Sequence, residues 1–426
     1  MLNEYIYYDY EEYKKSIKID NNKISIFNSH SIVSINTIEL SDIFGLNLDH
    51  DILTIHYFDR RNSPTKIVSE FIEFDTDIDN AHNTYNKLLH KLNICEKMYL
   101  FVINPVSGSG KAHKLFNNKI SPTIKKSFHS FYEIVTENKT SVETYLKNTA
   151  IIFDAIISVG GDGTTFDILQ AMKKLNIHIP LAIIPSGSGN GLSKSLTCLF
   201  NEKKPCNTYD YIYHLFKGTV RKIDTTRCYT TTCSYWSILG QSWGLPSDID
   251  IKSEYMRWLG SSRYTIQAII EFYRMKTYCG TIKYLPKSKE NLQLVEEEGV
   301  YVLDKYPNKC ELIHSNFTML WACQAPYMSD DAYIAPDANM GDKTIYLVII
   351  DGKSEISRYQ LIKLFMSLSS GTHVNNPHIK IIPVVAYSIV TSQTNHTDHS
   401  IITIDGEKSH DTCLKVRIDA PIDFIF

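Results

Sequence analysis

Two glycine-rich turns contain the groups that a phosphate-binding site needs. Gly160-Gly161-Asp162-Gly163 ends one short apolar run, and Ser186-Gly-Ser-Gly-Asn-Gly191 ends the next. Glycine lets the backbone pass close to a ligand, and exposed N–H groups at a turn or a helix N-terminus bind phosphate. The first turn also projects one carboxylate, that of Asp162. These residue types predict a site for phosphate or a nucleotide.

A third turn of small residues, Asn104–Ala112 (NPVSGSGKA), follows the apolar run Met98–Ile103. It is not a Walker phosphate loop, because Ala112 follows Gly110-Lys111 and Pro105 stands where that motif needs its first glycine. Its small residues still expose N–H groups at a helix start, with the Lys111 charge nearby. Taken alone, this loop fits a phosphate site and a structural turn equally well.

The elements that must position these turns read as an α/β domain at residues 97–220. Apolar runs at Ala155–Val159 and Leu181–Ile184 enclose a helical segment, Phe166–Leu175, which is the alternation of a parallel sheet. His129–Val135 predicts a further strand, and Val142–Lys147 a further helix. Ligands bind at the carboxyl ends of strands in such open sheets. The three turns are therefore expected to converge on one nucleotide cleft in a Rossmann-like, three-layer fold.

Residues 1–96 have a different pattern, in which short runs alternate as strands do and one helix, Asp79–Leu92, closes the segment. The predicted strands are Asn22–Phe27, Ser31–Ile35, Ile52–Tyr57 and Lys66–Ile72. This order fits a small β-barrel of pleckstrin-homology type and also fits other small β modules. Arg60, Arg61 and Lys66 form a thin cationic cluster, for which a scaffold role is favoured over binding of a lipid headgroup.

From residue 221 to residue 426 the strands become short and alternating, which favours a β-sandwich-like second domain. The predicted strands are Arg221–Thr226, Thr281–Leu285, Phe317–Cys323, Thr344–Ile350, His378–Ile382, Val384–Thr391, Ser400–Ile404 and Leu414–Ile418. Ser288–Asn308 is polar and acidic and is expected to be a surface excursion. Asp405-Gly406-Glu407 alone indicates only a hairpin turn.

A charged helix is expected in the second domain, with Ser247 or Asp248 as its N-cap and Gly260 at its end. Three charged residues share one face of it at i, i+4 and i+7, namely Asp250, Glu254 and Arg257. Arg263 follows one turn later, so that two arginines could clamp a phosphate; a solvated, salt-bridged face is the alternative. The next helix, Ile266–Tyr278, carries an apolar stripe that is predicted to pack in the core: Ile266, Ile269, Ile270, Phe272 and Tyr273.

Composition excludes several classes of protein. The formal net charge of −3 over 426 residues gives no basic signature for nucleic-acid binding. Nine scattered cysteines, an odd number without paired CxxC spacing, indicate reduced thiols in a cytoplasmic protein. No apolar run approaches the ~20 residues that span a bilayer. Any contact with a membrane is expected to be peripheral, and a homodimer is left open.

Together the motifs resemble those of the lipid kinases that share the diacylglycerol-kinase catalytic fold, and within them those of the sphingosine kinases. NPVSGSGKA, GGDGT at Gly160–Thr164 and PSGSGN at Pro185–Asn190 are similar to the nucleotide half of this family. GGDG also occurs in NAD kinases and phosphofructokinases, whereas WGLPSDIDIKSEYMRWLGSSRYT at Trp243–Thr265 resembles the sphingosine-kinase segment. The resemblance covers about residues 97–426.

The resemblance implies a role for each site residue. Asp162 would orient the attacking hydroxyl and accept its proton, among substrate-contacting residues that comprise Gly160, Gly161, Gly163, Asp250 and Glu254. ATP, as its Mg²⁺ complex, would be bound by Asn104, Pro105, Val106, Lys111, Thr136, Asp167, Gly187, Ser188, Gly189, Arg257, Arg263, Asp405, Gly406 and Glu407. The carboxylate that contacts the metal is not assigned. Family members often have arginine where this chain has Val106, so one phosphate contact is absent.

The implied reaction is ATP-dependent phosphorylation of the primary hydroxyl of sphingosine or a related sphingoid base. Asp250 would pair with the cationic amine of sphingosine at low local dielectric. Ceramide has a neutral amide at that nitrogen and diacylglycerol has no nitrogen, so kinases for these lipids are the alternatives. The hydrocarbon tail would lie in the second domain, with Leu245, Tyr264 and Ile269 as candidate neighbours.

Overall fold

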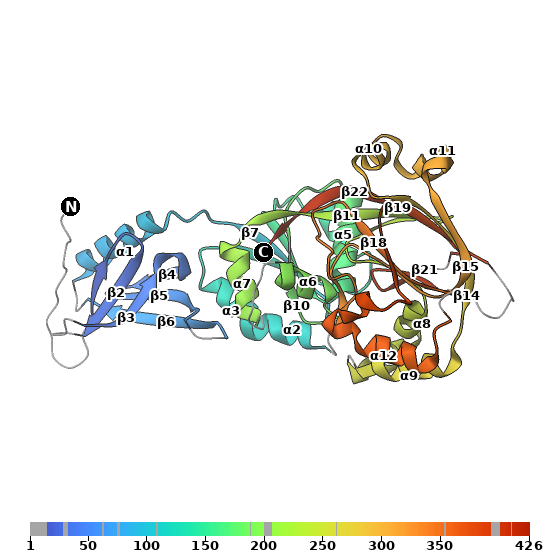
Figure 1. The fold of residues 1–426 in the computed structure, drawn as a ribbon. Coiled ribbons are helices and arrows are strands. Elements are labelled where there is room, and N and C mark those ends of the chain that lie inside the picture. Colours follow the sequence, from blue (N-terminus) through green and yellow to red (C-terminus); the bar gives the residue numbers. More distant parts are fainter. Residues whose placement is uncertain are drawn as a thin grey trace.

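The computed structural model describes residues 15–28, 33–61, 64–74, 77–107, 110–187, 189–199, 207–260, 262–352, 355–392, 401–409 and 411–426. Figure 1 shows a small N-terminal module at one end, an α/β domain in the middle and a β-rich domain at the other end. No helix in the described ranges is long and apolar enough to cross a membrane. The eight cysteines that the structure describes are all free thiols.

The N-terminal module consists of short strands and a closing helix, as the sequence predicted, and the strands form two antiparallel sheets. One sheet contains β1 (Lys15–Ile19), β2 (Lys23–Asn28) and β3 (Ser34–Glu39). After a 3₁₀ turn, η1 (Leu40–Asp42), the other contains β4 (Ile43–Asp49), β5 (Ile52–Asp59) and β6 (Lys66–Glu73), followed by α1 (Ile78–Leu92). The sequence did not predict β1 and β4, and part of the predicted strand Ser31–Ile35 lies outside the described residues. The pleckstrin-homology likeness stays a prediction.

The module is packed firmly onto the α/β domain. Phe44 and Phe58 are fully buried in the core of that domain, where both rings contact Phe216. The guanidinium of Arg60 lies 3.9 Å from the ring centre of Tyr213, and Arg61 donates to Asp59 over 2.9 Å. Two cations of the predicted cluster are thus occupied within the chain, which favours the scaffold role over headgroup binding.

The α/β domain has the predicted parallel sheet, in the order β10-β9-β7-β8. Its strands are β7 (Met98–Ile103), β8 (Ser130–Val135), β9 (Ala155–Gly160) and β10 (Leu181–Pro185). Its helices are α2 (Lys111–Leu115), α3 (Ser121–Lys125), α4 (Ser141–Asn148), α5 (Asp162–Lys174), α6 (Gly191–Leu199) and α7 (Thr208–Lys217), with a π-helical turn, η2 (Phe116–Ile120), between α2 and α3. β7 and β9 are almost completely buried, because helices cover both faces of the sheet.

The second domain is built from antiparallel strands that continue the same sheet, and several of them are longer than the short strands that the sequence predicted. They are β11 (Val220–Tyr229), β12 (Ser234–Ser237), β13 (Gly240–Gly244), β14 (Tyr278–Pro286), β15 (Glu311–Cys323), β18 (Ile345–Asp351), β19 (Lys380–Thr391), β20 (Ile402–Ile404), β21 (Glu407–Ser409) and β22 (Cys413–Ile425). β22 reaches β10, where Leu181 pairs with Phe424. Phe424 and Phe426 are therefore buried in the core of the α/β domain, so the two domains share one sheet and one core.

One prediction for this domain was wrong. The strands expected on either side of Pro383 form one strand, β19. Proline has no N–H to donate, but Pro383 lies opposite Lys287, one residue beyond the end of β14, where no strand needs that donor. The Pro383 carbonyl accepts from the Lys287 amide at this position. The excursion at 288–308 is helical, with α10 (Lys289–Glu298), η4 (Gly299–Tyr301), α11 (Val302–Lys305) and η5 (Pro307–Lys309). Its Val295, Val302 and Leu303 are buried against the sheet.

The expected charged helix from 248 to 260 is two shorter elements, so the single charged face was also wrong. α8 (Leu245–Lys252) begins earlier, after Gly244 at a φ of 82°, because Pro246 fits the first helical turn. It ends at Ser253, whose hydroxyl donates to the Asp250 carbonyl over 2.9 Å and competes with the helical bond. A 3₁₀ segment, η3 (Glu254–Leu259), follows, and then α9 (Ser262–Arg274).

The remaining elements lie beside α8 and α9. They are the hairpin β16 (Tyr327–Ser329) and β17 (Ala332–Tyr333), helix α12 (Arg358–Met366), and the 3₁₀ turns η7 (Leu368–Ser370) and η8 (Thr372–Asn375). α12 packs against α9 through an edge-to-face contact of Phe272 with Phe365, whose ring centres are 4.8 Å apart. The hairpin packs on α6, where the Ser195 hydroxyl accepts from the Tyr327 amide over 3.0 Å.

Candidate active site between the α/β and β-rich domains

Asp162 lies at the carboxyl end of β9 and opens α5, as the glycine turn predicted. Its carboxylate reaches the first turn of α6, where Oδ2 accepts from the Gly191 amide over 2.8 Å and Oδ1 from the Leu192 amide over 3.1 Å. Burial raises the pKa of Asp162 to about 7, although these two hydrogen bonds oppose the shift. The carboxylate is thus fixed in direction and poised near neutral pH as a proton acceptor.

The two glycine turns pack directly against each other. A Cβ atom on Gly187 would lie 2.5 Å from the Gly161 Cα atom, so only glycine fits at this contact. Asn190 closes the second turn, since its side-chain oxygen accepts from the Gly187 amide over 3.0 Å and its NH₂ donates to the Gly187 carbonyl over 2.9 Å. The neighbouring Ser188, predicted to bind the nucleotide, lies outside the described residues. The close contact keeps both turns at one edge of the sheet.

The predicted residues come together around one large cavity of about 1740 Å³ between the α/β and β-rich domains. Those that line it are Asn104, Pro105, Val106, Thr136, Gly161, Asp162, Gly163, Asp167, Gly187, Gly189, Asp250, Glu254, Arg263, Asp405, Gly406 and Glu407. Gly160 and Lys111 do not line it. Gly160 ends β9, where a Cβ would lie 2.2 Å from the Thr164 hydroxyl, and Lys111 starts α2. For Arg257 only the backbone, in η3, is described.

The Asp405-Gly406-Glu407 turn has two distinct parts. Asp405 and Gly406 have φ values of 48° and 83°, as a tight hairpin between β20 and β21 requires. The Asp405 carboxylate accepts from the Ser237 hydroxyl over 2.6 Å and from three successive backbone amides, those of residues 238–240. It therefore fixes the β12–β13 turn, while Glu407 extends across the cleft.

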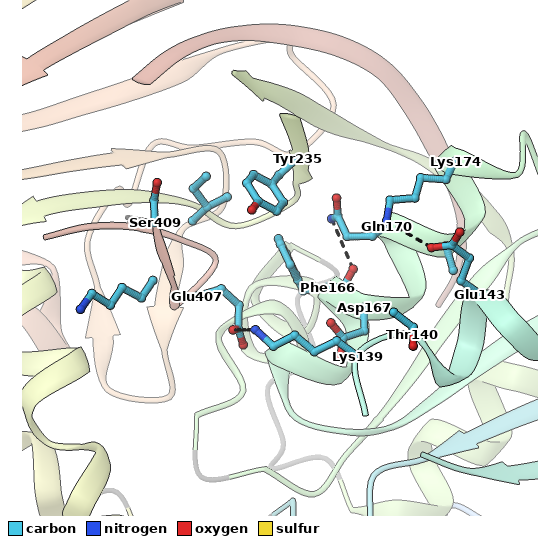
Figure 2. Close-up of a pocket in the computed structure, with 13 residues that line it drawn as sticks. Lys139, Thr140, Glu143, Phe166, Asp167, Gln170, Lys174, Tyr235, Glu407 and Ser409 are labelled. Atoms are coloured by element: carbon cyan, nitrogen blue, oxygen red, sulfur yellow. Dashed lines mark hydrogen bonds and ion pairs between the residues drawn. The ribbon is translucent and has the colours of Figure 1, made fainter. Parts of the chain in front are cut away.

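Glu407 meets Lys139 of the α/β domain, with 2.5 Å between Oε2 and Nζ. Figure 2 shows this ion pair at the edge of a smaller pocket of about 220 Å³ along α5, which shares Lys139, Asp167 and Glu407 with the large cavity. Phe166 and Tyr235 form apolar walls of the small pocket. Burial, with Glu407 nearby, raises the pKa of Asp167 to about 7, and Lys139 opposes this shift. The small pocket thus combines flat apolar walls with a carboxyl group that is partly protonated at neutral pH.

Arg263 is a cation that lines the cavity. It is buried, with 6% of its surface exposed, at the start of α9. Its Nη2 donates to the Tyr264 hydroxyl over 2.6 Å, and its Nη1 lies 3.7 Å from a Glu254 carboxylate oxygen. Nε and Nη1 have no hydrogen-bond partner among the described residues. Buried donors need acceptors, and these two line a cavity, where an anion could supply them.

The second half of the cavity is apolar, and the predicted core stripe on α9 was only partly right: Phe272 is buried in a core cluster, but other members of the stripe are exposed. Ile269 and Tyr273 are 63% and 80% exposed and line the cavity instead of packing in the core. α12 supplies the facing wall with Ile362, Phe365 and Met366. Of the candidate tail neighbours, Tyr264 and Ile269 line the cavity, whereas Leu245 is buried in a cluster beside it.

Sequence reasoning missed several lining residues, including all of α12, Lys139, Trp321 and the β16–β17 hairpin with Asp331. A signal for α12 was present, because Ser357 and Gln360 form a capping box ahead of an apolar run. No such local signal marks Lys139, whose partner is 268 residues away in the chain. Among the described residues, no group of three or more metal-ligating side chains is clustered.

Known proteins agree with this architecture. The model of the diacylglycerol kinase catalytic domain matches residues 98–228, and that of the YegS C-terminal NAD kinase beta sandwich-like domain matches residues 306–421. A crystal structure of a Bacillus anthracis protein assigned as a diacylglycerol kinase has the same fold, with a TM-score of 0.56, 18% identity, and coverage of 78% of this chain and 95% of that one. The chain thus carries a match to the diacylglycerol kinase catalytic domain at residues 98–228, and it is a lipid kinase.

Within that class, the curated relatives are kinases of sphingoid bases. Sphingosine kinase 1 of Arabidopsis thaliana is 26% identical, over 73% of this chain and 68% of the relative. Sphingosine kinase 1 of Homo sapiens is 23% identical, over 72% of this chain and 85% of the relative. Sphingoid long chain base kinase 4 of Schizosaccharomyces pombe is 24% identical, over 73% and 70%. Neither family model reaches the first 97 residues.

Proposed function

We propose that this chain transfers the γ-phosphoryl group of ATP to the primary hydroxyl of a sphingoid base, with sphingosine as the main substrate. One observation carries the proposal: a single cavity joins the glycine turns to an apolar chamber, and Asp250 lies on its wall with Asp162. Sphingosine needs these three features together, because it has a reactive hydroxyl, a cationic amine and a long tail. The relatives named as sphingosine kinases support the same substrate class.

The nucleotide would occupy the half of the cavity that the α/β domain lines. The Gly161 and Gly187 turns line that half, and the two Arg263 donors that lack a hydrogen bond fit its phosphates. The small pocket beside α5 is suited to a purine ring, because Phe166 and Tyr235 offer flat apolar walls and Asp167 a carboxyl group for hydrogen bonding. Val106, which is 73% exposed, supplies only its backbone here.

Mg²⁺ would arrive with the ATP phosphates. Proteins commonly hold Mg²⁺ through one or two carboxylates, substrate phosphates and water, without an all-protein cage. Asp331 lines the cavity and offers a carboxylate of the required kind, so the chain fits such a complex. The ion would neutralise charge on the transferring phosphoryl group.

The chain's own contribution to transfer would lie chiefly in Asp162. The two amides of α6 hold its carboxylate, so one oxygen lone pair can face an incoming hydroxyl in a fixed direction. It orients the hydroxyl and accepts the proton as the oxygen–phosphorus bond forms and the bond to the leaving ADP breaks.

The lipid would enter the apolar half with its head toward Asp162. Asp250 is close to the turn after β20, since a Cβ on Gly406 would lie 3.4 Å from its Oδ2. An ammonium there meets a carboxylate, whereas the amide of ceramide gains no ion pair and diacylglycerol has no nitrogen. The walls formed by α9 and α12 would cover the tail.

The substrate is tested by transfer of labelled phosphate from ATP to sphingosine, ceramide and diacylglycerol, each presented in the same detergent. We expect incorporation into sphingosine at least tenfold above that into the other two lipids, as one charge-assisted hydrogen bond is worth roughly 1.5–3 kcal/mol. Preferential labelling of diacylglycerol would favour the activity named for the structural neighbour. Labelling of no lipid would refute the proposal.

We also propose that the mouth of the cavity docks on a membrane surface. Five apolar side chains on η3, α9 and α12 are 63–80% exposed at or beside this mouth, namely Trp258, Ile269, Tyr273, Tyr359 and Met366. Apolar groups clustered at a rim insert into the boundary between headgroups and acyl chains. An enzyme whose substrate resides in a bilayer would gain direct access to it in this way.

Tyr359 tests the docking surface, because it belongs to the rim but does not line the cavity. Tyr359→Glu is expected to weaken binding to phosphatidylcholine vesicles roughly tenfold, the effect of losing one buried large side chain. Turnover of detergent-dispersed sphingosine should stay within about twofold of wild type. Tyr301→Glu is the matched control, since Tyr301 is 63% exposed on η4, which lies between α10 and α11 in the chain. Figure 1 shows α10 and α11 at the side of the domain opposite α9 and α12. Equal vesicle binding by both variants would contradict the proposed surface.

A further inference from the structure

Tyr264 occupies the point at which the parts of the cavity meet. It follows Arg263 on α9, and its hydroxyl crosses to the glycine turn of the α/β domain, 3.6 Å from where a Cβ on Gly189 would lie. Burial and then the negative charge of Asp250 raise its pKa to about 12, with Asp162 adding to the effect and Arg263 opposing it. The hydroxyl thus lies near the nucleotide turn, the proposed proton acceptor and the proposed amine partner.

The tyrosine hydroxyl also determines how Arg263 is held. Its oxygen accepts from Nη2 over 2.6 Å, and the guanidinium carbon lies 4.5 Å from the centre of the tyrosine ring. The other contact is longer, 3.7 Å from Nη1 to Glu254. Because the guanidinium is rigid and planar, fixing Nη2 also sets the direction of Nε and Nη1. These are the two donors of Arg263 that have no hydrogen-bond partner among the described residues.

A role in lining the lipid tail would need only the ring of Tyr264. A buried phenol loses its hydration, and phenylalanine would cover the same apolar surface without that loss. The hydroxyl is therefore explained by the hydrogen bond from Arg263 and not by packing.

We propose that Tyr264 is a positioning residue for phosphoryl transfer, whose hydroxyl holds the Arg263 guanidinium so that its remaining donors meet the terminal phosphates of ATP. This inference rests on the proposed function, because it assumes that Arg263 binds those phosphates. It adds a residue that acts through Arg263 and not on the lipid.

Tyr264→Phe isolates the hydroxyl, because the ring is kept. We expect kcat/KM for ATP to fall about tenfold, as a hydrogen bond between a neutral and a charged group is lost. KM for sphingosine should change less than twofold, and the melting temperature should stay within a few degrees of wild type. Tyr301→Phe, which removes an exposed hydroxyl outside the cavity, should match wild type in all three measurements. An unchanged kcat/KM for ATP in Tyr264→Phe would overturn the proposal.

A double-mutant cycle with Arg263→Met tests the path of the effect. In the Arg263→Met background, Tyr264→Phe should alter kcat/KM for ATP less than twofold, because methionine has no donors to position. A full tenfold loss in that background would show that Tyr264 acts independently of Arg263 and would refute the inference.

Nucleotide binding measured by calorimetry separates this inference from the choice of lipid. Tyr264→Phe should weaken binding of ATP severalfold and leave binding of AMP unchanged, because AMP lacks the terminal phosphates. This comparison needs no lipid, so it decides the role of Tyr264 even if the wild-type enzyme fails to phosphorylate sphingosine. Equal affinities of the variant and the wild type for ATP would count against the role.

Discussion

Replacing Asp162 by asparagine is expected to reduce kcat about a thousandfold while leaving the affinity for ATP within a fewfold of wild type. A carboxamide keeps the shape of the side chain but does not accept the proton of the attacking hydroxyl, and general base catalysis is typically worth 10²–10⁴-fold, roughly. Single-turnover transfer of labelled phosphate to sphingosine measures the loss, and calorimetry measures ATP binding. If the Asp162→Asn variant retained most of its turnover, another group would have to orient the hydroxyl.

The variant is expected to remain folded. Asn keeps one oxygen to accept from the α6 amides, although one of the two hydrogen bonds of Asp162 is lost. The charge of Asp162 has the opposite effect on stability to these hydrogen bonds, because the folded-state pKa of Asp162, about 7, lies above its pKa in the unfolded chain. The ionised carboxylate therefore lowers stability as pH rises through 7, and removing it offsets the lost bond. Thermal unfolding at pH 8 should show a melting temperature close to that of wild type.

The same pKa gives the wild-type rate a pH dependence. Because the ionised form of Asp162 accepts the proton, kcat should rise as pH increases through about 7 and then level off. The pKa of Asp167 is also raised to about 7, so the profile is repeated with Asp167→Asn. The midpoint should persist in that variant, since Asp167 is assigned to the nucleotide and not to the proton. If the midpoint of the kcat profile disappeared in Asp167→Asn, the titrating group would be Asp167.

The sequence was sufficient for the α/β domain because its signals are local. A strand buried on both faces is a continuous apolar run, as in β7, and a turn that approaches a ligand needs glycine, as at Gly161 and Gly187. The strand–turn–helix order then places the turns at one sheet edge. These features depend on neighbours in the chain and not on the rest of the fold.

Features that depend on distant parts of the chain were not predictable. The stripe on α9 has the period of a core helix, and nothing local shows that Ile269 and Tyr273 face a cavity closed by α12, about 90 residues later. The carboxylate of Asp405 holds the turn at residues 238–240, more than 160 residues earlier in the chain. Glu407 meets Lys139 only when the β20–β21 hairpin reaches the α/β domain.

Replacing Asp250 by asparagine is expected to raise KM for sphingosine at least tenfold with a smaller effect on kcat. The lost interaction is an ion pair to the substrate ammonium inside a largely apolar cavity, where a hydrogen bond to a charged group is worth roughly 1.5–3 kcal/mol. Steady-state kinetics at saturating ATP measure the change. Asp304→Asn is the matched control, because Asp304 pairs with Lys415 on the surface, where such pairs contribute little.

The role of Asp250 is tested most directly when the substrate is changed together with the enzyme. N-Acetylsphingosine has the same tail and hydroxyl but no charge on nitrogen, so Asp250→Asn should leave its slow turnover unchanged while that of sphingosine falls. Discrimination between the two lipids would thereby shrink about tenfold. If the variant lost activity on both lipids equally, Asp250 would support the cavity wall beside Gly406 and would not bind the substrate amine. Unchanged kinetics on sphingosine would place the ammonium elsewhere on the wall, with Asp331 and Glu254 as the remaining carboxylates to test.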